Sequence, residues 1–164
     1  MTVVIDVGAA QYGGDYSMER LIEQFEPEWL YGIDPNPDLT FPLAGTTKVE
    51  LISAAAWVHD GTIGYQADGL NSWVTDRRGA PTAPCFDLAR FIRELDEKHN
   101  DRLILKLDCE GAEYELLPHL IMDDVDELLD LTIVEWHDFV MTDPAKSREA
   151  IEKQIRCELQ EWPY

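Results

Sequence analysis

One stretch near the amino terminus constrains the fold more than any other part of the chain. Residues 3–7 are apolar except for Asp6, and most of them are β-branched. Such a run is typical of a parallel strand that is covered on both faces. A loop at residues 8–14 follows, and then an amphipathic helical pattern. The order strand, loop, helix predicts an open α/β sheet, in which a ligand lies beyond the carboxyl ends of the central strands.

Small residues fill the loop: Gly8, Ala9, Ala10, Gly13 and Gly14. Their size would let the backbone approach a nucleotide-like ligand closely. The spacing Gly8-x-Ala10-x-x-Gly13 is a degraded form of the dinucleotide fingerprint, and a plain strand-to-helix turn would also match it. The loop is therefore a candidate cofactor site, with Gly8, Ala9 and Gly13 as contact residues.

Asp6 indicates which ligand the loop favours. Its carboxylate precedes Gly8 by two residues, and residues 8–14 contain neither Lys nor Arg. A carboxylate at this position repels the pyrophosphate of a dinucleotide but attracts ammonium and sulfonium groups. We therefore expect S-adenosylmethionine rather than NAD.

Size and charge narrow the class of protein. The chain has 164 residues, which fits one domain over residues 1–164. Its 33 acidic and 13 basic residues give a formal net charge of −20, which repels nucleic acids and anionic membranes. We expect a small-molecule partner, and no nucleic acid or membrane.

The cysteines and the hydropathy pattern bear on the compartment. Cys85, Cys109 and Cys157 are odd in number and lack CxxC spacing, so neither a disulfide framework nor a zinc site is indicated. No apolar run approaches the ~20 residues of a membrane span, and no signal peptide is recognisable. We expect a cytoplasmic protein.

A second strand is predicted at residues 29–33, after a first helix that Pro27 ends. Asp34 follows this strand, some 26 residues after Gly8, where a doubly wound fold presents a carboxylate to ribose hydroxyls. Asn36, in the same turn, is a further candidate contact. The alternative is that Asp34 only opens an Asx turn.

The middle of the chain predicts a third strand, a hairpin and a helix. The strand is expected at residues 49–55, and Ala55 near its end leaves space for a flat group such as adenine or for a packed helix. Short alternating pieces at residues 62–66 and 72–75 predict a small hairpin, to which we assign no role. After a turn at residues 81–84, apolar positions from Phe86 to Leu95 recur with helical spacing.

Acidic residues gather where a fourth predicted strand, residues 102–108, turns into a helix. They are Asp108, Glu110, Glu113 and Glu115. Acids in a first helical turn are stabilised by the helix dipole, which is a sufficient reason for some of them. Asp108, however, ends an apolar strand beside the expected ligand crevice, and Gly111 allows a tight turn that aims Glu110 inward.

A fifth strand, residues 131–136, carries Glu135 and is followed by His137. A histidine after a strand is often an ordinary surface residue, but this strand is expected next to the fourth, which brings His137 near Asp108. After it, Asp143 caps and Pro144 begins a helix whose apolar stripe is expected to continue to Trp162.

Four segments together resemble the FkbM family of methyltransferases: Ile5-Asp-Val-Gly-Ala9, Ile33-Asp-Pro, Lys106-Leu-Asp-Cys-Glu-Gly-Ala-Glu113 and Val134-Glu-Trp-His137. The likeness covers roughly residues 3–140, and the segment from Lys106 to Glu113 is its most specific part. The chain departs from the family at Ala10, where Asn is common, and in having little sequence after the fifth strand.

The resemblance implies a fold and an activity. It implies a class I, three-layer Rossmann-like fold and O-methylation of a hydroxyl on a sugar or other secondary metabolite. Because only one predicted helix and a short tail follow the fifth strand, we expect the sheet order 3-2-1-4-5, with the terminal antiparallel strands reduced or missing. By this likeness Asp6 and Gly8 lie near the methionine part, Asp34 at the ribose and Asp108 near the sulfonium. We expect the tail after Trp162, or a second subunit in a homodimer, to cover the edge of the fifth strand.

The expected chemistry needs a base for the acceptor hydroxyl. His137 is the candidate, with an unperturbed pKa near 6.5, and Glu110 or Glu135 would orient it or replace it. We assign no metal site, although the same groups with Asp108 could instead hold a divalent cation that acidifies the hydroxyl. A trimmed domain that binds the cofactor without transferring its methyl group is the first alternative, and a nicotinamide-dependent oxidoreductase the second.

Overall fold

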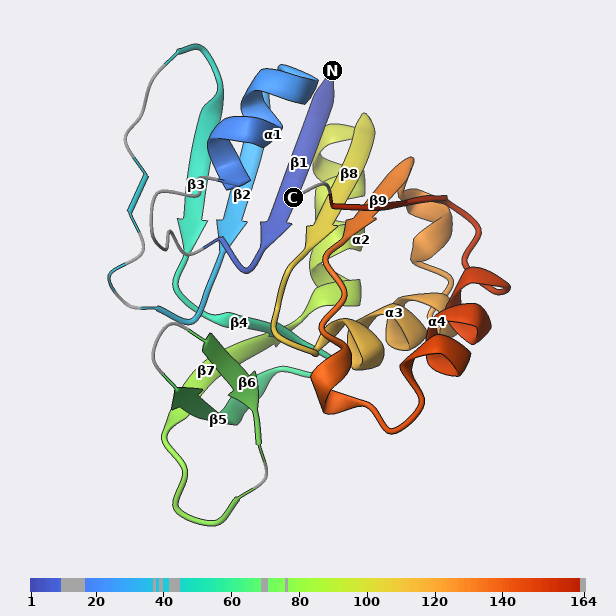
Figure 1. Ribbon diagram of the computed structural model, residues 1–164. Helices are drawn as coiled ribbons and strands as arrows, with labels where there is room; N and C mark the ends of the chain where they lie inside the picture. Colours follow the sequence, from blue (N-terminus) through green and yellow to red (C-terminus); the bar gives the residue numbers. More distant parts are fainter. Residues whose placement is uncertain are drawn as a thin grey trace.

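A sheet of six parallel strands forms the centre of the computed structural model (Figure 1). The structure describes residues 1–9, 17–36, 38, 40–41, 45–68, 71–75 and 77–162, without the side chains of residues 67, 68, 71, 72 and 140. In the described part the order of this sheet is β10-β9-β8-β1-β2-β3. The α/β class predicted from the sequence is confirmed, and the architecture is compatible with a Rossmann-like fold.

Helix α1 connects β1 to β2, and a second, smaller sheet is inserted between β3 and β8. The large sheet comprises β1 (Thr2–Val7), β2 (Trp29–Ile33), β3 (Lys48–Ile52), β8 (Arg102–Leu107), β9 (Leu131–Val134) and β10 (Glu158–Glu161). The small sheet comprises β4 (Ala55–Trp57), β5 (Gly61–Asp68), β6 (Asn71–Val74) and β7 (Thr82–Asp87). The helices are α1 (Ser17–Phe25), α2 (Leu88–His99), α3 (Glu113–Met122) and α4 (Pro144–Glu152), with 3-10 turns η1 (Asp126–Leu128) and η2 (Asp138–Val140).

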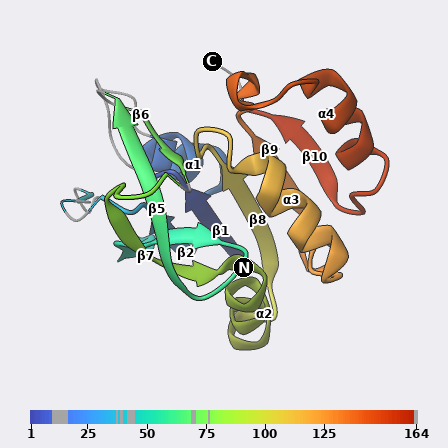
Figure 2. The same ribbon diagram turned by 90° about the horizontal axis from the view of Figure 1, so that it is seen from below.

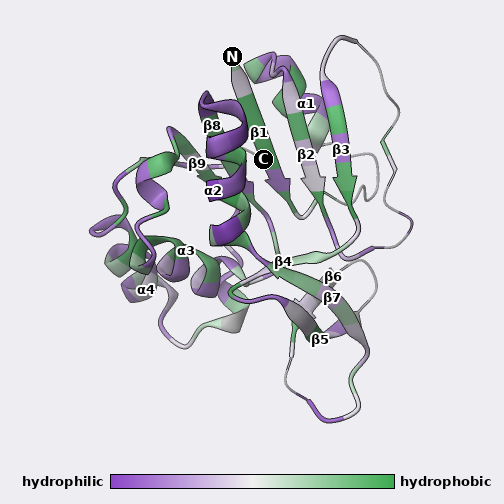
Figure 3. Cartoon of the chain, turned by 180° about the vertical axis from the view of Figure 1, so that it is seen from behind, coloured by the Kyte–Doolittle hydropathy of each residue, from purple (hydrophilic) through white to green (hydrophobic). Residues whose placement is uncertain are grey.

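Helices cover both faces of the large sheet. Successive residues of a strand point to opposite faces, and in the central strands both sets are apolar, so both faces are buried against helices. Val4 of β1 packs in one buried cluster with Met18 and Leu21 of α1. Val3 and Ile5 belong to a second cluster, which contains the buried faces of α2 and α3. Figure 3 shows the polar outer surface of α2 in front of the apolar strands. These two clusters make the fold three-layered.

The hairpin predicted between residues 62 and 75 is confirmed. β5 and β6 pair antiparallel, with Tyr65 opposite Val74. They belong to the small sheet, which Figure 1 shows below the arrowheads of β1, β2 and β3, at their carboxyl ends, and which Figure 2 views from that side. The hairpin therefore lies on the side of the molecule where a ligand of an open α/β sheet is expected.

Two predicted boundaries in this region are wrong. The third strand ends at Ile52, and Ala55 belongs to β4, where it pairs with Cys85 of β7. The helix expected from Phe86 begins at Leu88, because residues 82–87 form β7, in which Ala83 and Cys85 are buried and Thr82 and Pro84 are exposed. Pro84 lacks an amide proton and conceals this strand from a sequence pattern.

The prediction for the carboxyl-terminal segment is also wrong. Asp143 caps α4 and Pro144 begins it, as expected, but the helix ends at Glu152 instead of continuing to Trp162. The amide of Arg156 donates to Asp126 Oδ2 at 2.8 Å, and this contact directs the chain into β10, which pairs parallel with β9. The edge of β9, assigned to the tail after Trp162 or to a second subunit, is covered by β10.

Candidate functional site

The sheet order reverses direction between β1 and β8. From β1 the chain proceeds through β2 to β3 on one side, whereas β8, β9 and β10 lie on the other side. At such a switch point the loops after the two strands diverge and leave a crevice that binds ligands in many α/β proteins. The residues that follow these two strands therefore define the candidate site.

Gly8 and Asp108, the first residues after β1 and β8, are in direct backbone contact. Gly8 has φ +84°, and a Cβ atom built on it would lie 1.6 Å from the carbonyl oxygen of Asp108. The amide of Gly8 donates to Ile33 O at 2.9 Å, and that of Asp108 donates to Val7 O at 3.0 Å. Only glycine fits this position, since any other side chain would occupy the place of the Asp108 carbonyl.

Asp6 is turned away from solvent and paired within the protein. Its side chain is 0% exposed, and its Oδ1 lies 3.2 Å from Lys106 Nζ, which is also 0% exposed. Ser17 donates its hydroxyl to Asp6 Oδ2 at 2.6 Å. Burial would lower the pKa of Lys106, but the charges of Asp6 and Asp108 outweigh it and hold that pKa above its usual value. The predicted attraction of Asp6 for a cationic ligand is thus largely balanced by Lys106.

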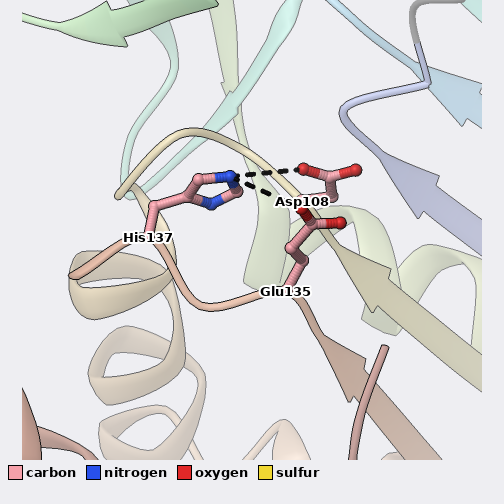
Figure 4. Close-up of side chains that lie close together, drawn as sticks. All are labelled: Asp108, Glu135 and His137. Atoms are coloured by element: carbon pink, nitrogen blue, oxygen red, sulfur yellow. Dashed lines mark ion pairs between the residues drawn. The ribbon is translucent and has the colours of Figure 1, made fainter. Parts of the chain in front are cut away.

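Asp108 connects this buried pair to a cluster around His137. Asp108 Oδ2 accepts from Lys106 Nζ at 2.8 Å, and its Oδ1 lies 3.8 Å from His137 Nε2. The same nitrogen lies 3.8 Å from Glu110 Oε2 and 3.9 Å from Glu135 Oε1. Figure 4 shows the imidazole directed at Asp108 and Glu135, which come from the ends of β8 and β9. The structure therefore brings Asp108, Glu110, Glu135 and His137 together, as expected from the sequence.

Glu113 fixes the orientation of the imidazole from its other side. This carboxylate is 0% exposed, and its Oε1 accepts from His137 Nδ1 at 3.0 Å and from the amide of Cys109 at 2.7 Å. With Nδ1 engaged in this way, Nε2 is the ring atom presented to the three other carboxylates. Glu113 therefore positions His137.

The pKa of His137 lies well above the value near 6.5 of an unperturbed imidazole. Burial would lower it, but the neighbouring carboxylates, Glu113 first among them, raise the pKa of His137 to about 9. The imidazole is therefore a cation at neutral pH in the protein alone, and it cannot accept a proton in that state. A second cation in the cluster would compete with this proton.

The turn between β8 and α3 aims Glu110 inward, as predicted. Glu110 has φ +54° and Gly111 φ +100°, and this sharp turn directs the Glu110 carboxylate toward His137. Glu110 Oε2 is buried without a hydrogen-bond partner in the described part of the chain. Burial is the main reason that the pKa of Glu110 is raised.

The other candidate cofactor residues have mixed outcomes. Asp34 does open an Asx turn, because its Oδ1 accepts from the amide of Asn36 at 2.8 Å. It follows β2 and so lies beside the end of β1, where Gly8 and Ala9 both donate to Ile33 O. Ala9 is itself buried, and Gly13 lies outside the described residues. Ala55 is one strand removed from the position expected at the end of β3.

Sequence reasoning missed two groups of residues at this site. Lys106 was noted only as part of a motif, although a lysine within the apolar strand 103–107 signals a buried ion pair. Trp73 of β6 lies edge-to-face with Phe139, and Phe139 lies edge-to-face with His137. No pattern in the sequence connects the hairpin with this turn.

The residues that directly follow the described strands of the large sheet are acidic or uncharged. The two residues that follow each of β1, β2, β3, β8 and β9 include no Lys or Arg.

Comparisons of the chain with models of known protein families, with curated proteins and with solved structures gave no match. Among the described helices, none has the length and apolar composition needed to cross a bilayer.

Proposed function

We propose that this protein is an S-adenosylmethionine-dependent O-methyltransferase that acts on the hydroxyl of a small molecule. The observation that carries the proposal is the contact of Gly8 with Asp108 at the switch point, next to an acidic cluster that contains one histidine. A glycine turn and a carboxylate meet there, at the place where open α/β sheets bind nucleotide-like ligands.

The order of the large sheet supports a class I methyltransferase fold. Its strands β3, β2, β1, β8 and β9 are adjacent in that order, and β10 adds one parallel strand beside β9. No antiparallel strand follows β9 in the described residues, which agrees with reduced terminal strands. The resemblance of residues 106–113 to the FkbM motif is a further argument for a methyltransferase.

The charge of the site supports a cationic cofactor over a dinucleotide. Asp108, Glu110 and Glu135 are partly exposed at the strand ends, whereas Lys106 is fully buried. The negative charge of a pyrophosphate would be repelled by these carboxylates, whereas the positive charge of a sulfonium would be attracted to them. Asp34, which follows β2 beside the end of β1, is the proposed contact for the ribose hydroxyls.

When bound, the cofactor supplies a methyl group on a positively charged sulfur, which is the difficult part of the reaction. The protein must then hold the acceptor oxygen in line and take its proton. Glu110 Oε2 and Glu135 Oε1, which lie 3.8 and 3.9 Å from His137 Nε2, are the candidate bases, because the raised pKa of His137 keeps its imidazole protonated. Glu113 keeps the imidazole in position beside these two carboxylates.

An acceptor screen tests the proposal. The protein is incubated with S-adenosylmethionine carrying a labelled methyl group and with panels of sugars, phenols and other hydroxylated metabolites. Label in an acceptor, dependent on His137 and Asp108, is the expected result. Cofactor binding without transfer to any acceptor would favour the non-catalytic binding domain, and the absence of binding would contradict the proposal.

A further inference from the structure

The side chains around His137 Nε2 are arranged as ligands around a common point. Nε2 lies 3.8 Å from Asp108 Oδ1, 3.8 Å from Glu110 Oε2 and 3.9 Å from Glu135 Oε1. Each of these distances is too long for a hydrogen bond. A cation that binds two ligand atoms at ~2.0–2.3 Å, however, keeps those atoms roughly 3–4 Å apart. One atom each from Asp108, Glu135 and His137 lies within 4.8 Å of the others.

The imidazole is held as a metal-binding imidazole usually is. A ligating histidine commonly donates its second ring nitrogen to a carboxylate, which fixes the ring and its tautomer. Here Glu113 accepts from Nδ1 at 3.0 Å, and its side chain is 0% exposed. Nε2 is thereby directed into the cluster.

Buried oxygens in the same place lack donors. Glu113 Oε2 and Glu110 Oε2 are both buried without a hydrogen-bond partner in the described part of the chain. Burying a carboxylate oxygen without compensation is costly. Lys106 forms ion pairs with Asp6 and Asp108. Glu110 Oε2 lies 3.8 Å from His137 Nε2, so this unpartnered oxygen is on the Nε2 side of the ring, whereas Glu113 binds the Nδ1 side.

From this geometry we infer a divalent-cation site with Asp108, Glu135 and His137 as protein ligands and Glu110 beside it. One imidazole among carboxylates suits Mn²⁺ or Zn²⁺ better than Mg²⁺ or Ca²⁺, which prefer oxygen ligands only. Three protein ligands leave coordination positions open for water or for an acceptor hydroxyl. This inference does not depend on S-adenosylmethionine being the cofactor.

Titration of the chelator-treated protein with Mn²⁺ alone tests the site. Electron paramagnetic resonance measures the unbound Mn²⁺, and the expected result is one bound ion per chain. Asp108→Asn and Glu135→Gln should each weaken binding by ~10-fold or more. The matched control is Glu115→Gln, which removes the same charge from an exposed position of α3 and should leave the affinity unchanged.

Electron spin echo modulation adds a signature that a diffuse acidic surface would not give. Bound Mn²⁺ should show coupling to one imidazole nitrogen, and His137→Gln should abolish it. Circular dichroism of each variant establishes that it is folded. Asp108→Asn removes a partner of Lys106 and could unfold the protein for that reason, in which case Glu135→Gln alone tests the ligands. No bound ion in the native protein, equal loss in Glu115→Gln, or affinity unchanged in both ligand variants would overturn the inference.

Discussion

The carbonyl oxygen of Asp108 occupies the space into which a side chain at Gly8 would project, 1.6 Å from an ideal Cβ. This contact arises because β1 and β8 are neighbours in register, with Val7 opposite Leu107, so that both chains leave the sheet side by side. The turn that begins at Gly8 and the carboxylate that begins the acidic cluster are therefore one structural unit.

Substitution of Gly8 by Ala should destabilise the protein strongly. The variant combines a positive φ with a backbone collision, and we expect a loss of at least ~2 kcal/mol beyond that of a matched control. Gly79→Ala is that control: Gly79 has φ +85° but nothing lies within 4 Å of its ideal Cβ. Its expected loss is ~1–2 kcal/mol. Urea unfolding of both variants measures the difference, and equal losses would show that the collision is relieved without cost.

Removal of the buried Lys106 should lower the free energy of unfolding, because it leaves the Asp6 carboxylate without its counter-charge. Lys106→Met leaves Asp6 fully buried without its cation, and we expect a loss of ~3–5 kcal/mol in the free energy of unfolding. Asp6→Asn in the same chain should recover ~1–3 kcal/mol of this, because the amide needs no counter-charge. The double-mutant cycle is measured by urea unfolding. Strict additivity of the two losses would argue against a direct coupling.

Asp87 should make stability depend on pH in a defined direction. Its side chain caps α2 by accepting from the amide of Arg90 and also contacts His119. Burial would raise the pKa of Asp87, but these hydrogen bonds outweigh it, so the pKa lies below the usual 3.8. The stabilisation is therefore complete above the pKa of the unfolded chain and is lost as pH falls through the lower pKa of the folded protein.

Asp87→Ala should accordingly cost ~0.5–2 kcal/mol at pH 7, and the difference from the native protein should shrink as pH falls below about 4. Asp87→Asn keeps a capping oxygen that does not titrate, and it should lose less at pH 7. Thermal unfolding at several pH values measures both. A difference that grows toward acid pH would contradict the assignment.

The sequence predicted the strands of the large sheet other than β10, because they carry strong local signals. Residues 3–7 and 103–107 are apolar except for Asp6 and Lys106, and they are followed by Gly8 and Asp108. These patterns predict both strands and the edge of the sheet at which the site lies. The cluster of Asp108, Glu110, Glu135 and His137 could also be predicted, since parallel strands bring their carboxyl ends to one edge.

Long-range contacts decided what could not be predicted. Residues 153–162 have helical spacing, but Arg156 binds Asp126 and Glu127 and so directs the chain into a strand. The contact of Trp73 with Phe139 joins a hairpin to a turn 66 residues away and leaves no periodic signal. The raised pKa of His137 depends on Glu113 being fully buried beside it, which spacing alone does not reveal.

Asp34 should matter for the cofactor more than its neighbours do. Asp34→Ala should weaken S-adenosylmethionine binding by ~1–3 kcal/mol if its carboxylate holds the ribose hydroxyls. Asp38→Ala, an exposed acid of the same loop, is the matched control and should have no comparable effect. Calorimetry measures both. Unchanged affinity in Asp34→Ala would refute the ribose assignment but leave the switch-point site in place.

A parallel calorimetric titration with S-adenosylmethionine, S-adenosylhomocysteine and NAD tests the central claim most directly. The acidic strand ends around Asp108 should accept the first two ligands at one site per chain. They should reject NAD, because the described strand ends present carboxylates and neither Lys nor Arg to its pyrophosphate. Tight binding of NAD, or no heat of binding with any of the three ligands, would contradict the proposed cofactor and with it the proposed methyl transfer.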